Sequence, residues 1–406
     1  MNFLPDWPPA YTSQIAFGIL LLAGALGGYL AHRISWLPSI TGFMAIGFLI
    51  GPSGIDLLTQ ESLDQARPLI GVALALILYR LGLSLDLRAM LRDRRLLFVA
   101  AAESSASFLA CYGLLVWLGL SPFLAALAAA IAISSSPAVL IHVAHELGAV
   151  GPTTERAKEM VALNNLFSFL AFSAALPFAH LATDADLATA LLQPIYRLAG
   201  SAFVAIAIAW LLVQLARRTR SAPQYRFALV VGALMLGVGI ADSLLLSPLF
   251  VPLAMGVAVR SLETEGESLS EIEFGEAFEL FFIVLFVFAG SKIKPALFAQ
   301  IGLMALAFVG ARFLAKWLIV HGFLWRHGIG HRSATATGLL LMPMAGLAIG
   351  LVQTADQLFG AQVETLYALI LVAVAILETL GPPVAAWAFR LCGEASKVGA
   401  GGPAPP

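Results

Sequence analysis

The chain has 406 residues, of which 60% are hydrophobic and only 12% are charged. Because a soluble globular domain carries roughly 25% charged residues, this composition excludes an ordinary water-soluble protein and indicates a membrane protein. The net charge of −1 at pH 7 points to no particular class of partner, and we expect no nucleic-acid partner.

Membrane-spanning helices need about 20 apolar residues each, because the hydrocarbon core of a bilayer is about 30 Å thick. The sequence has thirteen apolar stretches, the ninth of them short, separated by short polar loops. They lie at residues 13–32, 36–52, 67–86, 96–118, 121–146, 157–181, 194–215, 225–245, 248–260, 276–292, 296–322, 332–355 and 363–390. We therefore predict an all-α polytopic membrane protein, with one transmembrane domain over residues 1–392 and a disordered cytoplasmic tail over residues 393–406.

The basic residues give this chain an orientation. Most of its 23 Lys and Arg residues fall on loops that follow odd-numbered spans. Basic loops favour the cytoplasmic side, so we expect a multi-pass protein of the inner membrane with its N-terminus outside and its C-terminus in the cytoplasm. The first ten residues contain no Lys or Arg, and a cleavable signal peptide is not expected.

Spans 4 and 5 carry polar residues that a lipid-facing helix would not tolerate. Glu103 in span 4 is a candidate proton carrier, because a buried carboxyl can keep its proton near neutral pH; a structural ion pair with Arg80 is the alternative. Span 5 is interrupted near its middle by a proline, which removes a helical hydrogen bond, and by three hydroxyls. The residues of this interruption are Ser134, Ser135, Ser136 and Pro137.

Spans 6 and 11 add amides and cations. Asn164 and Asn165 in span 6 can coordinate a cation through their carbonyl oxygens but cannot carry a proton, and an interhelical hydrogen bond is the alternative. Arg312 and Lys316 in span 11 are four residues apart and so share one helix face. Either can counter a carboxylate or the negative ends of interrupted helices, while Lys316 can also extend toward the cytoplasm.

Span 12 repeats the interruption of span 5, with Pro343 followed by Gly346. The two spans are seven helices apart and therefore cross the membrane in opposite directions, which is typical of an inverted repeat with a binding site at the midplane. Two simple proline kinks, patched by serine hydroxyls, are the alternative. Glu378 in span 13 is a second candidate proton carrier.

Several of these motifs, in this order, resemble the monovalent cation:proton antiporter family, which includes bacterial sodium/proton exchangers and the membrane part of potassium-efflux systems. The resemblance covers nearly all spans. The runs that carry it are Trp36–Ser53, Tyr79–Asp86, Ser134–Val139 with Glu146–Gly148, Phe286–Gly290, Arg312–Lys316 and Pro343–Gly350.

The resemblance implies a sodium/proton antiporter-like fold. It would consist of a scaffold that forms a homodimer and a mobile core that holds both crossed broken helices and moves like an elevator. The family usually has an Asp-Asp or Asn-Asp pair in span 6, where this chain has Asn164 and Asn165. A glutamate common in the second broken helix is also replaced, by Gly346 or a neighbour. Lys316 matches the lysine that pairs with the family's aspartate in electrogenic relatives.

We therefore expect a secondary transporter that exchanges Na⁺ or K⁺ for protons in the lipid bilayer. Because the usual Asp pair is replaced, two alternatives stay open: the same fold carrying an anion or a neutral solute, or a transport-inactive sensor. An enzyme is not expected, because no nucleophile–base set is evident. No Cys/His cluster has metal-ligand spacing, and we expect neither a metal nor another cofactor.

Overall fold

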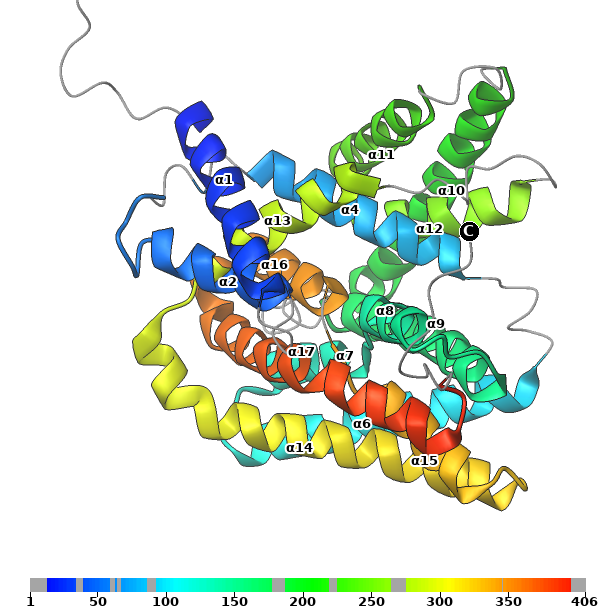
Figure 1. Ribbon diagram of the computed structural model, residues 1–406. Coiled ribbons are helices and arrows are strands. Elements are labelled where there is room, and N and C mark those ends of the chain that lie inside the picture. Colours follow the sequence, from blue (N-terminus) through cyan, green and yellow to red (C-terminus); the bar gives the residue numbers. More distant parts are fainter. Residues whose placement is uncertain are drawn as a thin grey trace, which may run out of the picture. The chain divides into compact units, whose positions relative to one another are not determined.

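The computed structural model describes residues 13–33, 39–58, 63, 67–85, 93–176, 187–218, 225–263, 275–344 and 346–395. Over these residues the regular structure is helical throughout (Figure 1). The helices are α1 Ser13–His32, α2 Ser39–Ile50, α4 Arg67–Ser84, α6 Arg94–Trp117, α7 Pro122–Ile133, α8 Pro137–Glu146, α9 Pro152–Ala175, α10 Leu187–Arg218, α11 Arg226–Ser243, α12 Phe250–Leu262, α13 Gly275–Ser291, α14 Pro295–Arg326, α15 His331–Leu340, α16 Gly346–Phe359 and α17 Glu364–Cys392, with the short 3₁₀ helix η3 Gly360–Val363 before α17.

These helices confirm the all-α polytopic prediction. Each predicted span overlaps one described helix, or one pair of half-helices in spans 5 and 12. Seven described helical segments are long and apolar enough to cross a membrane, and shorter apolar helices lie at Thr41–Ile50, Leu69–Leu83 and Phe250–Leu262. The largest shift at the start of a span concerns α10, which begins at Leu187 rather than at residue 194.

The sixth span begins at Pro152, five residues before the predicted start at 157. Hydropathy misses this first turn because it is polar. It is nevertheless a good helix start: Pro152 needs no hydrogen-bond acceptor for a backbone N–H, and Glu155 complements the positive end of the helix dipole. The predicted end of this span, residue 181, lies outside the described residues.

The chain divides into two compact units. Unit 1 comprises residues 1–84 and 195–299, and unit 2 comprises residues 85–194 and 300–406. In unit 1, α4 packs against α12 and α2 packs against α13. The α4–α12 contact brings backbones together, because a Cβ on Gly82 would collide with the carbonyl oxygen of Leu253 and one on Gly256 with that of Tyr79. Glycine therefore sets how closely these helices approach.

Unit 2 contains both interrupted helices. Residues Ser134–Ser136 separate α7 from α8, and a second non-helical stretch that includes Leu341–Met344 separates α15 from α16. The two linkers contact each other directly. The backbone N–H of Ser136 donates to the carbonyl oxygen of Pro343 at 2.8 Å, and the Ser135 hydroxyl donates to that of Leu341 at 2.8 Å. The predicted pair of crossed discontinuous helices is thus present in one compact unit.

A residue from the C-terminal segment caps α9 in the same unit. Gly151 precedes α9 and has no side chain to cap it, so the carboxylate of Glu394 takes this role. It accepts hydrogen bonds from the backbone N–H of Thr153 at 2.7 Å, from that of Thr154 at 2.8 Å and from the Thr154 hydroxyl at 2.7 Å. A Cβ on Gly151 would collide with this carboxylate. Glu394, the second residue of the predicted disordered tail, is therefore held in place, while residues 396–406 lie outside the described part.

The Glu394 cap predicts a pH-dependent stability. Burial opposes the charged form, but the hydrogen bonds from Thr154 and Thr153 prevail and lower the pKa of Glu394 below its usual value. A carboxyl whose pKa is lower in the folded state stabilises the protein above its unfolded-state pKa, and this contribution disappears as pH falls through the folded-state pKa. We expect Glu394→Gln to lower the free energy of unfolding by about 1 kcal/mol at neutral pH and to have no effect at strongly acidic pH. Thermal unfolding of the purified protein over a pH series measures both; an equal loss at all pH values would contradict the charged cap.

Candidate functional site

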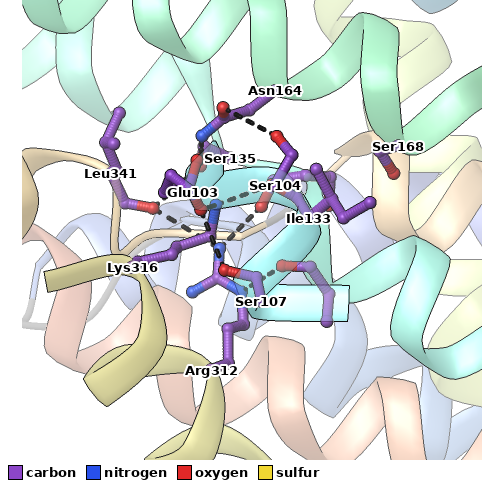
Figure 2. A network of polar contacts seen from close by, with 12 residues as sticks. Glu103, Ser104, Ser107, Ile133, Ser135, Asn164, Ser168, Arg312, Lys316 and Leu341 are labelled. Atoms are coloured by element: carbon purple, nitrogen blue, oxygen red, sulfur yellow. Dashed lines mark hydrogen bonds and ion pairs between the residues drawn. The ribbon is translucent and has the colours of Figure 1, made fainter. Parts of the chain in front are cut away.

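A network of buried polar groups surrounds the point where the two linkers of unit 2 meet (Figure 2). Its side chains come from α6, α9, α14 and the Ser134–Ser136 linker, and the charged ones are at most 1% exposed. Backbone carbonyls from the ends of α7 and α15 complete it. The network thus joins elements that lie far apart in the sequence.

Arg312 on α14 ties the two interrupted helices together. Its Nε donates to the carbonyl oxygen of Ala132 at 2.8 Å, and one Nη donates to that of Ser134 at 2.6 Å. The same Nη also makes a longer bond of 3.4 Å to the carbonyl oxygen of Leu341, and the other Nη donates to that of Met342 at 2.6 Å. One fully buried guanidinium therefore satisfies backbone oxygens at the breaks of both helices.

The end of α7 shows how completely the freed backbone is paired. A helix leaves its last four carbonyl oxygens without intrahelical partners. In α7 the carbonyl oxygen of Ala130 accepts from Ser168 at 2.8 Å, and that of Ile131 accepts from the Ser134 hydroxyl at 2.7 Å. The next two oxygens accept from cations, Ala132 from Arg312 at 2.8 Å and Ile133 from Lys316 at 2.7 Å. The break is therefore stabilised by side chains of α9 and α14.

Lys316 also forms a buried ion pair with Glu103. The ammonium nitrogen lies 2.8 Å from Oε1 of Glu103, with the two side chains 1% and 0% exposed. The Ser107 hydroxyl donates to the same oxygen at 2.9 Å. Oε2 of Glu103 has no hydrogen-bond partner among the described residues. Glu103 thus pairs with Lys316, whereas its predicted alternative partner was Arg80.

Both asparagines of α9 contact Ser135. Oδ1 of Asn165 accepts from the Ser135 backbone N–H at 3.0 Å, and Nδ2 of Asn164 lies 3.5 Å from the Ser135 hydroxyl. Oδ1 of Asn164 also accepts from Ser104 at 3.4 Å. Adjacent helical side chains point about 100° apart, and here they reach the backbone and the side chain of the same linker residue. The first linker is therefore held by amides from α9 as well as by the cations from α14.

The charges of this network nearly cancel. Arg312 and Lys316 against Glu103 leave a formal excess of one positive charge. The C-terminal ends of α7 and α15 face these cations through the Ile133 and Leu341 carbonyl oxygens, and each helix end carries roughly half a negative charge. A bound metal ion is therefore not needed for electrical balance while Lys316 is protonated.

Some predicted site residues have other roles. Ser136 caps α8, its hydroxyl lying 3.4 Å from the Val139 N–H, and Pro137 starts that helix. Pro343 lies in the second linker and Gly346 begins α16. Glu378 lies on α17, where neither of its carboxylate oxygens has a hydrogen-bond partner among the described residues. It is therefore not a member of the network.

Sequence reasoning missed Ser104 and Ser107, which contact Asn164 and Glu103. Ser107 lies four residues after Glu103 and so on the same face of α6, a spacing that could have indicated it. The backbone acceptors of both linkers could be anticipated as a class but not as individual atoms, because their partners depend on tertiary packing.

The comparison with protein families decides the classification. Residues 18–390 match the family described as sodium/hydrogen exchanger, transmembrane. The chain belongs to this family. This match confirms the family that the sequence motifs resemble.

The fold is also that of a solved member of this class. The structure of the sodium proton antiporter MjNhaP1 from Methanocaldococcus jannaschii at pH 8 matches 95% of this chain and 99% of its own, with a TM-score of 0.73 and 19% sequence identity. At 19% identity, this similarity shows that the two chains share a fold. A comparison with curated proteins gave no match.

The Lys316–Glu103 pair predicts a large difference between single and double substitutions. Removing one partner of a buried ion pair costs about 3–5 kcal/mol, because the other charge is left buried and unpaired, whereas replacing both is often nearly neutral. We expect Lys316→Met alone to destabilise the protein strongly and the double variant Glu103→Gln, Lys316→Met to recover most of the loss. Chemical unfolding in detergent micelles measures the difference.

The matched control is the exposed pair Lys158–Glu155 on α9, with an N–O distance of 2.9 Å and side chains 41% and 63% exposed. Because exposed pairs contribute about 0–1 kcal/mol, Lys158→Met should cost little. Equal losses for Lys316→Met and Lys158→Met would contradict the buried pair.

Proposed function

We propose that this exchanger moves a monovalent cation, Na⁺ or K⁺, across the inner membrane in exchange for protons, and that the Lys316–Glu103 pair is where the two compete. The observation that carries the proposal is the buried contact of 2.8 Å between these side chains, beside the crossing of two broken helices. A lysine ammonium and an alkali cation are both single positive charges that a carboxylate can bind.

Exchange of a proton for a cation follows because the ammonium and the alkali cation can occupy the same carboxylate. While Lys316 is protonated, its ammonium occupies Oε1 of Glu103. If the ammonium loses its proton, the carboxylate loses its counter-charge and can bind a cation in its place. The neutral oxygens nearby are those of Ser107, Ser104 and Asn164, from α6 and α9. Proton-loaded and cation-loaded forms of the pair then have the same net charge, which suits a buried site.

Arg312 has a positioning role in this proposal. Its donors are engaged with carbonyl oxygens of both linkers, so it holds the two breaks around the pair. The same engagement argues against the anion alternative, because Arg312 is bonded to backbone and Lys316 to Glu103 and Ile133. An anion would have to displace strong contacts of both cations.

The two compact units suggest how the site could alternate between the two sides of the membrane. Unit 2 contains every side chain of the network, so the site can move as part of one body. We propose an elevator-type movement of unit 2 in the membrane, with unit 1 as the scaffold of a homodimer, and an N-terminus outside the cell. This movement would be measured by crosslinking of engineered cysteine pairs under opposite pH gradients.

Exchange is tested with the full chain in proteoliposomes that hold a pH gradient and a pH-sensitive dye. We expect Na⁺ or K⁺ to collapse the gradient in the native protein. The double variant Glu103→Gln, Lys316→Met should fold but not respond, because it has no titratable group at the site. Lys158→Met serves as the control and should respond normally. Cation-driven proton movement in the double variant would reject the proposed site.

Competition between proton and cation predicts a specific pH dependence. The apparent KM for the cation should fall as pH rises, by at least about tenfold per pH unit in the range where Lys316 stays mostly protonated, since one proton must leave the Lys316–Glu103 pair for each cation bound there. The measurement is the initial rate of exchange against cation concentration at several pH values. A constant KM with a changing maximal rate would indicate that proton and cation bind at separate sites.

A further inference from the structure

Glu378 is the second deeply buried carboxyl of unit 2, and its surroundings differ from those of Glu103. It lies at the middle of α17 and is 1% exposed. Neither Oε1 nor Oε2 has a hydrogen-bond partner among the described residues. A charged side chain in the middle of a membrane helix costs at least about 2.5–3.5 kcal/mol, so an unpaired carboxyl there favours its neutral, protonated form.

The face of α17 that carries Glu378 packs toward the second break. Val374, Gly381 and Ala385 share this buried face with it, at the spacing of successive helical turns. A Cβ on Gly381 would lie 3.0 Å from the side chain of Pro343, so α17 touches the linker between α15 and α16 directly. Glu378 is one turn away from this contact.

The backbone of α17 is weakened at the same place. Pro382 and Pro383 lie inside the helix, and neither can donate to the carbonyl oxygen four residues earlier. These oxygens belong to Glu378 and Thr379. The Glu378 carbonyl therefore lacks the usual helical donor four residues later, and its carboxyl has no hydrogen-bond partner among the described residues.

No charged side chain among the described residues is hydrogen-bonded to Glu378. The helices α7, α8, α15, α16 and η3 pack against α17. None of their described titratable or charged side chains is hydrogen-bonded to Glu378. These side chains are His142, His145, His331, Arg332 and Asp356.

We propose that Glu378 is a second proton-binding carboxyl of the exchanger, which releases its proton when a cation binds. This second role rests on the proposed function. One proton would come from the Lys316–Glu103 pair and one from Glu378, giving two protons per cation. On release the O–H bond breaks, the proton passes to water and the carboxylate remains. The site would take only a proton, while the cation binds at Glu103.

A set of contacts leads from the Lys316–Glu103 pair toward the face of α17 that carries Glu378. Lys316 donates to the carbonyl oxygen of Ile133 at 2.7 Å, where the first linker begins. Three residues on, the backbone N–H of Ser136 donates to the carbonyl oxygen of Pro343 at 2.8 Å, and Pro343 packs on Gly381. A shift of the first linker on cation binding would therefore reach the face of α17 that carries Glu378. Opening of that face would hydrate the carboxyl and allow its ionisation.

Infrared difference spectroscopy of the full chain in lipid vesicles tests this directly, because a protonated carboxyl has its own C=O stretching band. We expect this band in the native protein at neutral pH, and we expect Na⁺ or K⁺ at alkaline pH to reduce it. Glu378→Gln, which matches the neutral side chain in shape, should fold and lack the band, while the exposed-site control Glu155→Gln should keep it.

The ratio of protons to cations, found from the opposing gradients at which net flux stops, completes the test. We expect two protons per cation in the native protein and one in Glu378→Gln. A native protein without the band, or with a band that neither pH nor cation changes, would overturn the role of Glu378. If exchange then still runs at one proton per cation, the proposed function stands and only the second proton is rejected; absence of any exchange would reject both.

Discussion

Two helices that break inside a membrane must have their freed carbonyl oxygens paired within the protein, and the rest of unit 2 depends on this constraint. Hydrocarbon offers no donors, so each unpaired oxygen would cost several kcal/mol. Arg312 meets this need at both breaks at once, with bonds of 2.6–2.8 Å to Ala132, Ser134 and Met342. Ser168 and Lys316 pair two further oxygens of α7. Two cationic side chains of the protein therefore hold the two breaks in place.

The two cationic side chains, Arg312 and Lys316, have different roles. Arg312 bonds only to backbone oxygens in the described network, whereas Lys316 bonds to one backbone oxygen and to a carboxylate. A carboxylate is the group for which a lysine proton and an alkali cation can compete. The sodium/hydrogen exchanger family resembled by the sequence usually places that carboxylate in span 6. Here span 6 holds Asn164 and Asn165, and the carboxylate that meets Lys316 is Glu103 on α6. The proposed exchange site thus keeps the lysine of the family and takes its acid from a neighbouring helix.

Much of this architecture could be predicted from the sequence because membrane helices leave strong signals. Hydropathy located the spans, and α1 begins and ends at the predicted residues, 13 and 32. The prolines at 137 and 343 marked both breaks. The partner of Glu103 could not be predicted, because Lys316 is 213 positions away and Arg80 satisfied the same chemical requirement. The Glu394 cap could not be predicted for a related reason. The composition of the C-terminal segment is typical of disorder, and the start of α9, which Glu394 caps, lies 240 positions earlier.

Calorimetric titration of the purified protein with Na⁺ and K⁺ at alkaline pH, in two buffers that differ in ionisation enthalpy, tests the central claim most directly. The difference in heat between the buffers counts the protons released per cation bound. We predict that cation binding releases protons from the native protein, and that the folded double variant Glu103→Gln, Lys316→Met shows neither binding nor release. Cation binding without proton release in the native protein, or unchanged proton-coupled binding in the double variant, would contradict competition at the Lys316–Glu103 pair.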